Sequence, residues 1–126
     1  MRSENSAVEL RVRRRAHGLG FRYRLHLKTL PGRPDLVFRK YRLALFVHGC
    51  FWHRHSGCPL ARIPKSRVEF WTEKLEGNRI RDLAQQSRLD ELEWRWAVIW
   101  ECQTQDRNGL DRLLRETISG GRDAIR

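Results

Sequence analysis

The chain has 126 residues, 40% hydrophobic and 33% charged, and this balance predicts one globular domain over residues 1–126 with a polar tail at about 120–126. No apolar run approaches the roughly 18–20 residues of a membrane span, and none follows Met1, so we expect neither a membrane anchor nor a signal peptide. The formal net charge is +11, and residues 1–62 hold all of the excess, with 14 basic and 3 acidic side chains. This asymmetry favours nucleic acid over an anionic membrane surface as the partner.

The first predicted element is a helix that ends near Gly18 to Gly20. Ser6 and Glu9 have the S-x-x-E spacing of a capping box, and Val12 and Ala16 continue an apolar stripe at helical spacing. The spacing therefore predicts that Ser6 begins the helix and that Glu9 completes the cap.

Three strands are predicted next, at residues 21–27, 35–38 and 43–47, with turns at 31–34 and 39–40 between them. The third strand is a continuous apolar run, which is typical of a strand buried on both faces. Residues 48–64 that follow have no periodicity and contain several Cys and His residues, so we expect an irregular loop rich in metal ligands.

A second capping box, Ser66 to Glu69, predicts the start of a long helix, and residues 94–100 and 110–118 predict a buried strand and a closing helix. The element order α-β-β-β-α-β-α predicts an α/β fold, with a mixed sheet flanked by helices. The predicted core includes an apolar face of the long helix and three tryptophans of the last strand: Trp71, Leu75, Ile80, Leu83, Leu89, Leu92, Trp94, Trp96 and Trp100.

The loop contains a dense group of metal-ligand residues. Cys50, His55 and Cys58 supply three ligands from one segment, and Cys102, just after the last strand, is the only cysteine left for the fourth. Three Cys and one His form a complete tetrahedral set for structural zinc. The alternative is that the cysteines are small buried apolar residues and the histidines lie on the surface; the density of ligands favours zinc.

Two further histidines, His48 and His53, remain if zinc takes His55. A histidine beside a metal-bound loop can act as a general base because its pKa lies near working pH. The alternative is a solvated or capping histidine.

Asp35 follows Pro34 at the entry of a strand, where a carboxylate can hold Mg²⁺, although Pro-Asp is also ordinary turn chemistry. Nucleases commonly place a second acidic residue and a lysine on the next strand, and residues 43–47 contain neither. His48, at the end of that strand, occupies the position instead.

Aromatic residues form the third group. Phe51 and Trp52 lie between candidate metal ligands, next to basic residues such as Arg54 and Lys65, and Trp71 begins the following helix. Burial in the core and stacking on or between DNA bases are equally compatible with this pattern.

Together these residues resemble the very-short-patch repair (Vsr) DNA mismatch endonuclease family. The similarity covers roughly residues 2–116, and its most specific parts are HGCFWH at 48–53 and the distant WEC at 100–102. Other matching segments are residues 30–35, residues 64–74, Asn78 and Arg81-Asp82.

The resemblance implies a restriction-endonuclease-like core of the PD-(D/E)XK type. It also implies Mg²⁺-dependent hydrolysis that nicks DNA on the 5′ side of the thymine in a T:G mismatch. By the matching motifs, Asp35 resembles the catalytic aspartate that binds Mg²⁺, and Val47 the residue whose backbone carbonyl also binds it. His53 resembles the histidine that activates water, and His48 the one that supports the phosphate and the metal waters. Glu9 matches an acidic position near the active site, although its role as a helix cap is an equal alternative.

The remaining implied roles concern zinc and DNA. Cys50, His55, Cys58 and Cys102 resemble the structural zinc ligands, whereas Phe51, Trp52 and Trp71 resemble aromatic residues that wedge into DNA beside the mismatch. We also expect DNA contacts from the basic residues Arg33, Arg54 and Lys65.

The partner implied by the resemblance is double-stranded DNA with a mismatch, and mismatch-repair proteins are further candidates. We expect a monomer that works in the cytoplasm on the nucleoid, without a membrane. Two alternatives stay open: a nuclease of the same fold that acts on another DNA lesion, and a zinc-stabilised DNA-binding module without catalysis.

Overall fold

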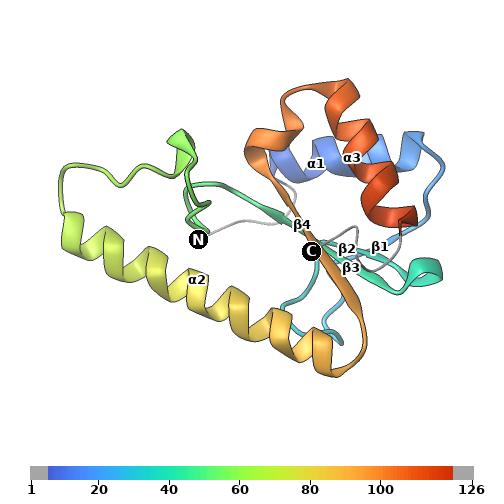
Figure 1. Cartoon of the computed structure of the whole chain (residues 1–126), viewed down its shortest axis with the longest axis horizontal. Coiled ribbons are helices and arrows are strands. Elements are labelled where there is room, and N and C mark those ends of the chain that lie inside the picture. The colour runs from blue at the N-terminus through green and yellow to red at the C-terminus, as the bar shows by residue number, and fades with distance from the viewer. Residues whose placement is uncertain (1–5, 121–126) are drawn as a thin grey trace.

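A mixed four-stranded sheet lies between two layers of helices in the computed structural model, which describes residues 6–120 (Figure 1). The elements in chain order are α1 (Ala7–Gly18), β1 (Arg24–Leu25), β2 (Leu36–Phe38), β3 (Leu43–His48), α2 (Val68–Glu91), β4 (Arg95–Trp100) and α3 (Arg107–Ser119). Short 3₁₀ turns lie at Arg39–Tyr41, Pro59–Ala61 and Glu101–Thr104. Residues 121–126 of the predicted polar tail lie outside the described part of the chain.

The sheet has the strand order β1-β2-β3-β4. The first two pairings are antiparallel, and β3 pairs with β4 in parallel from Leu43 beside Arg95 to His48 beside Trp100. This confirms the predicted mixed sheet. Because β3 and β4 are parallel, their carboxyl ends lie side by side, so the segments that follow His48 and Trp100 begin at one edge of the sheet.

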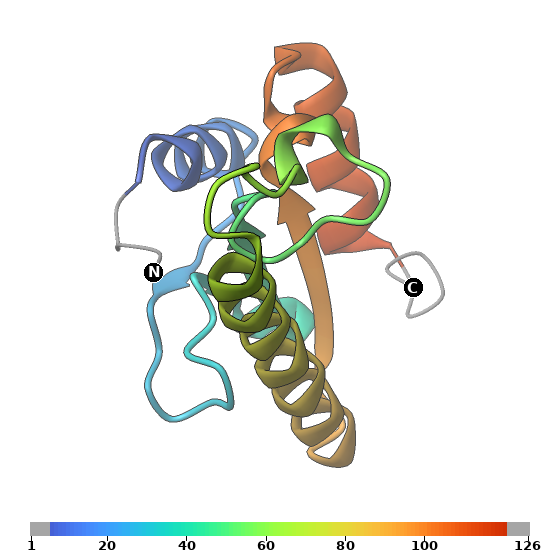
Figure 2. The ribbon, with the colours of Figure 1, turned by 90° about the vertical axis from the view of Figure 1, so that its left-hand side faces the viewer.

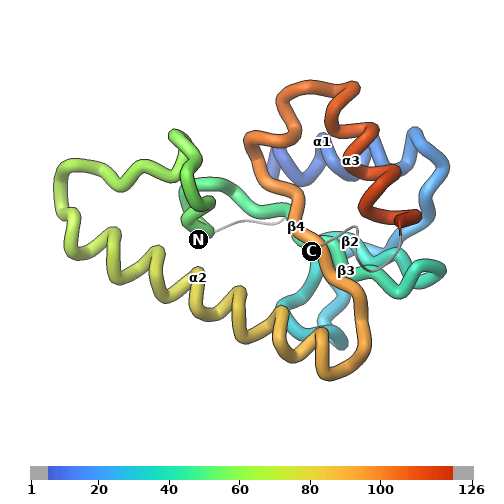
Figure 3. The backbone as a smooth tube through the Cα atoms, viewed as in Figure 1, coloured from blue at the N-terminus to red at the C-terminus, as the bar shows by residue number. Residues whose placement is uncertain are grey.

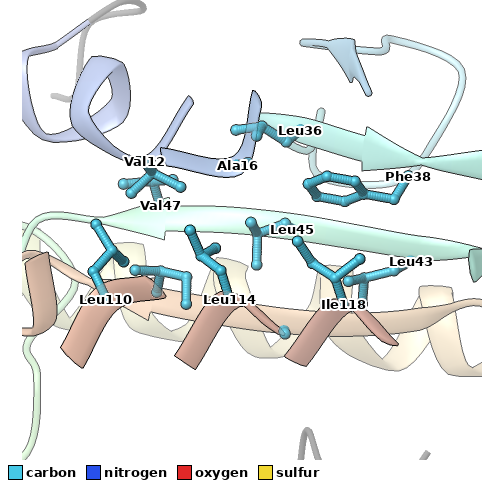
Figure 4. Packing of buried hydrophobic residues seen from close by; sticks show 12 residues of the cluster. Val12, Ala16, Leu36, Phe38, Leu43, Leu45, Val47, Leu110, Leu114 and Ile118 are labelled. Carbon is cyan, nitrogen blue, oxygen red and sulfur yellow. The ribbon is translucent and has the colours of Figure 1, made fainter. Parts of the chain in front are cut away.

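The two faces of β3 pack against different helices. Leu43, Leu45 and Val47 contribute to the main core, beside α1 and α3 (Figure 4). Ala44 and Phe46 belong to a smaller cluster with Leu89 of α2 on the other face. Successive side chains of a strand point to opposite faces, so His48 belongs to the face covered by α2. The main core contains the following buried residues: Val12, Ala16, Leu36, Phe38, Leu43, Leu45, Val47, Ala97, Ile99, Leu110, Leu114 and Ile118.

The long helix α2 stands apart from α1 and α3, and Figure 2 shows it below them, with its N-terminal end nearest the viewer. Its start differs from the prediction: Arg67, in a left-handed conformation, precedes the helix, and no side chain caps it. Its buried face is also narrower than predicted. Leu75 and Leu89 are buried, but Ile80, Leu83 and Leu92 are about half exposed, at 58%, 49% and 50%. The reason is helical geometry: at about 100° per residue, Leu75 and Leu89 lie on one narrow stripe of α2, and the three half-exposed residues lie to either side of it.

Two strand predictions also need correction. The strand predicted at residues 21–27 is reduced to Arg24–Leu25, because His26 adopts a positive φ of 46° that ends it. Trp94 and Trp96 pack on the smaller core cluster as predicted, whereas the ring of Trp100 stacks on His55 in the ligand-rich loop. Within residues 6–120, no helix combines the length and apolar character needed to cross a membrane.

Candidate active site and metal centre

The four predicted zinc ligands come together at the carboxyl ends of β3 and β4. The ligand atoms of Cys50, His55, Cys58 and Cys102 all lie within 4.8 Å of one another. His55 Nδ1 lies 3.5 Å from Sγ of Cys50 and 3.5 Å from Sγ of Cys102. A tetrahedral zinc site with ordinary bond lengths places a sulfur and a nitrogen about 3.5 Å apart, so the donor set and its spacing fit such an ion.

The backbone and the neighbouring side chains hold this cluster in place. The N–H of His55 donates to the carbonyl of Cys50 at 3.0 Å, and the N–H of Cys50 donates to Oε1 of Glu101 at 3.2 Å. The imidazole of His55 stacks on Trp100, with ring centroids 4.1 Å apart. Burial raises the pKa of the Cys50 thiol to about 12 and also raises that of Cys102. A metal that binds thiolates must therefore displace these protons.

A second group joins the end of β3, the loop and α2. The rings of His48 and His53 are stacked, with centroids 3.8 Å apart and planes 4° apart. Nδ1 of His53 lies 2.5 Å from Oδ2 of Asp82 on α2, so the carboxylate fixes the orientation of the ring. A histidine oriented by a carboxylate through one nitrogen presents the other nitrogen for proton transfer.

The third group contains the predicted aspartate. Asp35 is buried, and its Oδ2 accepts a 2.7 Å hydrogen bond from the N–H of Val47. The carboxylate of Glu9 is also buried, 2.7 Å from Nε2 of His26. Glu9, His26 and Asp35 offer ligand atoms that all lie within 4.8 Å of one another, a spacing that suits a divalent cation.

The role predicted for Glu9 in a capping box is only half correct. Its backbone N–H donates to the side chain of Ser6 at 3.2 Å, as expected at a helix start. The carboxylate, however, contacts His26 and Arg13. The side chain of Glu9 therefore belongs to the cluster with Asp35.

The three predicted wedge residues form one aromatic group, in which Phe51 and Trp52 come from the loop and Trp71 from the start of α2. Phe51 packs edge-on against both Trp52 and Trp71, with centroids 5.1 and 5.4 Å apart, and the two tryptophans lie 6.0 Å apart. All three side chains are partly exposed, so they lie outside both core clusters. Asn78 of α2 donates to the carbonyl of Trp52 at 3.0 Å and attaches the loop to the helix, whose course Figure 3 traces.

The predicted basic residues have different surroundings. Arg33 lines a cavity of about 270 Å³ together with His48, His53 and Arg81. The guanidinium of Arg54 lies 3.6 Å from the carboxylate of Glu76, and this negative charge partly neutralises the positive charge of Arg54. Lys65 is exposed in the segment before α2.

Sequence reasoning missed the contributions of His26, Asp82, Arg81 and Glu101. Asp82 and Arg81 were visible only as a matching dipeptide, and Glu101 only as the centre of WEC, because nothing in a helix or strand pattern indicates which distant group a side chain meets. His26 carried no signal beyond its residue type, since it lies inside an apparent strand.

The sheet order, the flanking helices and a buried aspartate at a strand entry define the restriction-endonuclease-like class of α/β proteins. Residues 1–59 match the family model described as DNA mismatch endonuclease Vsr. The chain is 48% identical over 118 residues to the type II nicking enzyme V.XorIIP of Xanthomonas oryzae, covering 94% of this chain and 86% of that protein.

Two further relatives extend the same comparison. The DNA mismatch endonuclease Vsr of Escherichia coli is 43% identical over 117 residues, covering 92% of this chain and 74% of that protein. The type II nicking enzyme V.NmeAIP of Neisseria meningitidis is 40% identical over 118 residues, covering 90% and 84%. The chain therefore belongs to the Vsr family of DNA mismatch endonucleases.

Proposed function

We propose that the protein nicks one strand of duplex DNA on the 5′ side of the thymine in a T:G mismatch, by Mg²⁺-dependent phosphodiester hydrolysis. One observation carries the proposal: the end of β3 joins a buried aspartate to a pair of stacked histidines. The N–H of Val47 bonds Asp35, and the next residue, His48, stacks on His53. Family membership supports DNA with a mismatch as the substrate.

The metal assignments follow from the donor sets. Asp35 and the backbone carbonyl of Val47 would hold Mg²⁺, with Glu9 beside them. When bound, Mg²⁺ supplies Lewis-acid polarisation of the phosphate and stabilises charge on the leaving oxygen. The cluster of three cysteines and His55 would hold Zn²⁺ as a structural ion.

We assign the proton transfer to His53. Its Nδ1 is engaged by Asp82, so the remaining nitrogen, Nε2, can take a proton from the attacking water. His48 packs flat against His53 and restricts the movement of its ring. We assign His48 to a contact with the scissile phosphate. The reason is that His48 and His53 line the same cavity as the cationic side chains of Arg33 and Arg81.

We assign DNA distortion to the aromatic group of Phe51, Trp52 and Trp71. Flat side chains beside a basic surface can stack between bases and compensate for part of the cost of unstacking, which a mismatch already lowers. The excess of basic residues in the N-terminal half would supply phosphate contacts. We further propose that the whole chain acts as one endonuclease domain and as a monomer.

The direct test uses the purified protein and a labelled duplex with a single T:G mismatch. We expect a nick 5′ to the thymine with Mg²⁺ present and none when EDTA removes the metals. The matched T:A duplex and duplexes with the other mismatches are the controls. Equal cleavage of T:A and T:G duplexes would contradict mismatch specificity. Cleavage only at another mismatch would contradict the assignment of T:G as the substrate and leave the hydrolytic mechanism unchanged.

A second prediction concerns the orienting carboxylate. Asp82→Asn keeps a hydrogen-bond acceptor near His53 but removes the negative charge. The imidazole ring of His53 is then less firmly oriented, and the imidazolium that forms when it takes a proton is less stabilised. We expect kcat to fall by about 10- to 100-fold with little change in KM, since general bases contribute roughly 10²–10⁴-fold. Single-turnover nicking measures the change. Glu91→Gln, at the exposed far end of the same helix, is the control that should keep full activity.

A further inference from the structure

His26 has an unusual backbone for a residue in an apparent strand. Its φ is 46°, in the left-handed region that non-glycine residues seldom occupy. Conformations of this kind persist where the surroundings fix them, and they occur often at functional sites. The backbone N–H of His26 donates to the carbonyl of Asp35 at 3.1 Å, which fixes His26 beside the aspartate.

The ring of His26 then reaches the other carboxylate of the cluster. Nε2 of His26 lies 2.7 Å from Oε2 of Glu9, and Arg13 lies 3.6 Å from the same oxygen. The side chain of Glu9 is fully buried, and within residues 6–120 its second oxygen, Oε1, has no hydrogen-bond partner. A buried carboxylate oxygen without a partner is costly unless a ligand satisfies it.

We propose that His26 is a positioning residue that holds Oε2 of Glu9, so that Oε1 is presented to a divalent cation shared with Asp35. The inference rests on the metal site of the proposed function, and it adds a residue that neither the sequence motifs nor the family comparison assigned. Groups that orient a metal ligand through a hydrogen bond tune metal affinity without touching the ion. His26 contacts both carboxylate residues of the cluster: its backbone N–H donates to the carbonyl of Asp35, and its ring contacts the carboxylate of Glu9.

The alternative is a structural contact that only joins α1 to the β1–β2 segment. The two roles differ in one respect: a structural contact changes stability, whereas a positioning contact changes metal affinity at constant stability. Two amide substitutions separate them. In Gln the amide nitrogen reaches about as far as Nε2 of histidine, whereas in Asn it reaches only as far as Nδ1. Asn also tolerates a positive φ, so His26→Asn suits the backbone but is too short to reach Glu9.

The experiment measures Mn²⁺ binding by electron paramagnetic resonance, using zinc-loaded full-length protein on a T:G duplex with an uncleavable linkage. We expect His26→Asn to weaken Mn²⁺ binding by about 10- to 100-fold and His26→Gln to stay within about threefold of wild type. Calorimetry should give both variants a similar Tm. His17→Asn, at an exposed position of α1, is the matched control and should bind Mn²⁺ as wild type does.

Every outcome decides the inference. Unchanged Mn²⁺ affinity in His26→Asn, or equal weakening in both variants together with a lower Tm, overturns it in favour of the structural contact. Absence of Mn²⁺ binding that depends on Asp35 overturns it as well. If Mn²⁺ binding follows the expected order but T:G duplexes are not nicked, then the proposed substrate fails and the role of His26 stands.

Discussion

Asp35→Asn should reduce nicking of a T:G duplex by about 10³-fold or more, because removing a metal ligand forfeits several kcal/mol of transition-state stabilisation and each 1.36 kcal/mol is tenfold in rate. Asn has nearly the shape of Asp, and its carbonyl oxygen can still accept the hydrogen bond that Oδ2 of Asp35 receives from the N–H of Val47. We therefore expect the fold and the affinity for DNA to survive. Single-turnover kinetics at saturating Mg²⁺ measure the loss of nicking, and a DNA-binding assay measures the retained affinity.

The chain offers a matched control for this substitution. Asp90 also accepts a hydrogen bond from an N–H group, that of the Trp96 indole, at 2.9 Å. Asp90→Asn makes the same chemical change in the last turns of α2 and should leave the nicking rate within about twofold, as for an ordinary surface substitution. A rate for Asp35→Asn within tenfold of wild type would exclude Asp35 as the metal-binding aspartate.

The second large effect is expected on stability. Cys102→Ser removes the one cluster ligand outside the loop, so we expect the variant to lose its zinc. The loop at 49–67 contains only a short 3₁₀ turn of regular structure, so we expect a bound zinc to contribute much of what holds its shape. We expect a loss of about 3 kcal/mol and a Tm lower by about 10 °C, with zinc content and calorimetry as the measurements.

Ser56→Ala is the control for the loop, since Ser56 is exposed between two of the ligands and is not one of them. It should keep about one zinc per chain and the wild-type Tm. A Cys102→Ser protein with the same zinc content and Tm as wild type would contradict the metal assignment. Retained zinc with a lower Tm would instead assign Cys102 to packing alone.

Much of the fold was predictable from local patterns. The run Leu43 to Val47 predicted a strand buried on both faces, and all of β3 is buried. The element order predicted a mixed sheet, which the parallel pairing of β3 and β4 confirms. The failures occur where a long-range contact overrides a local pattern. Ile80 and Leu83 continue an apolar stripe along α2, but exposed helix faces and buried ones look alike when the neighbouring layer is unknown.

The candidate site shows the same division. The ligand set of Cys50, His55 and Cys58 was visible because its members are close in sequence, and Cys102 followed because only one cysteine remained. Asp82 lies 29 positions from His53, and nothing in a helical sequence indicates that a carboxylate will meet a particular histidine. The capping pattern predicted the backbone contact of Glu9 with Ser6 correctly. It did not predict the contact of the Glu9 carboxylate with His26, because that partner lies outside the helix.

The end of β3 connects the sulfur cluster to the proposed catalytic group. Within residues 47–53 the chain supplies the N–H that holds Asp35, the histidine that stacks on His53, and the first thiol of the sulfur cluster. On the proposed assignments, one short segment therefore connects the structural cluster to the groups that act on the phosphate. A substitution in the cluster should then change the nicking rate as well as the stability, although no cluster residue touches the substrate.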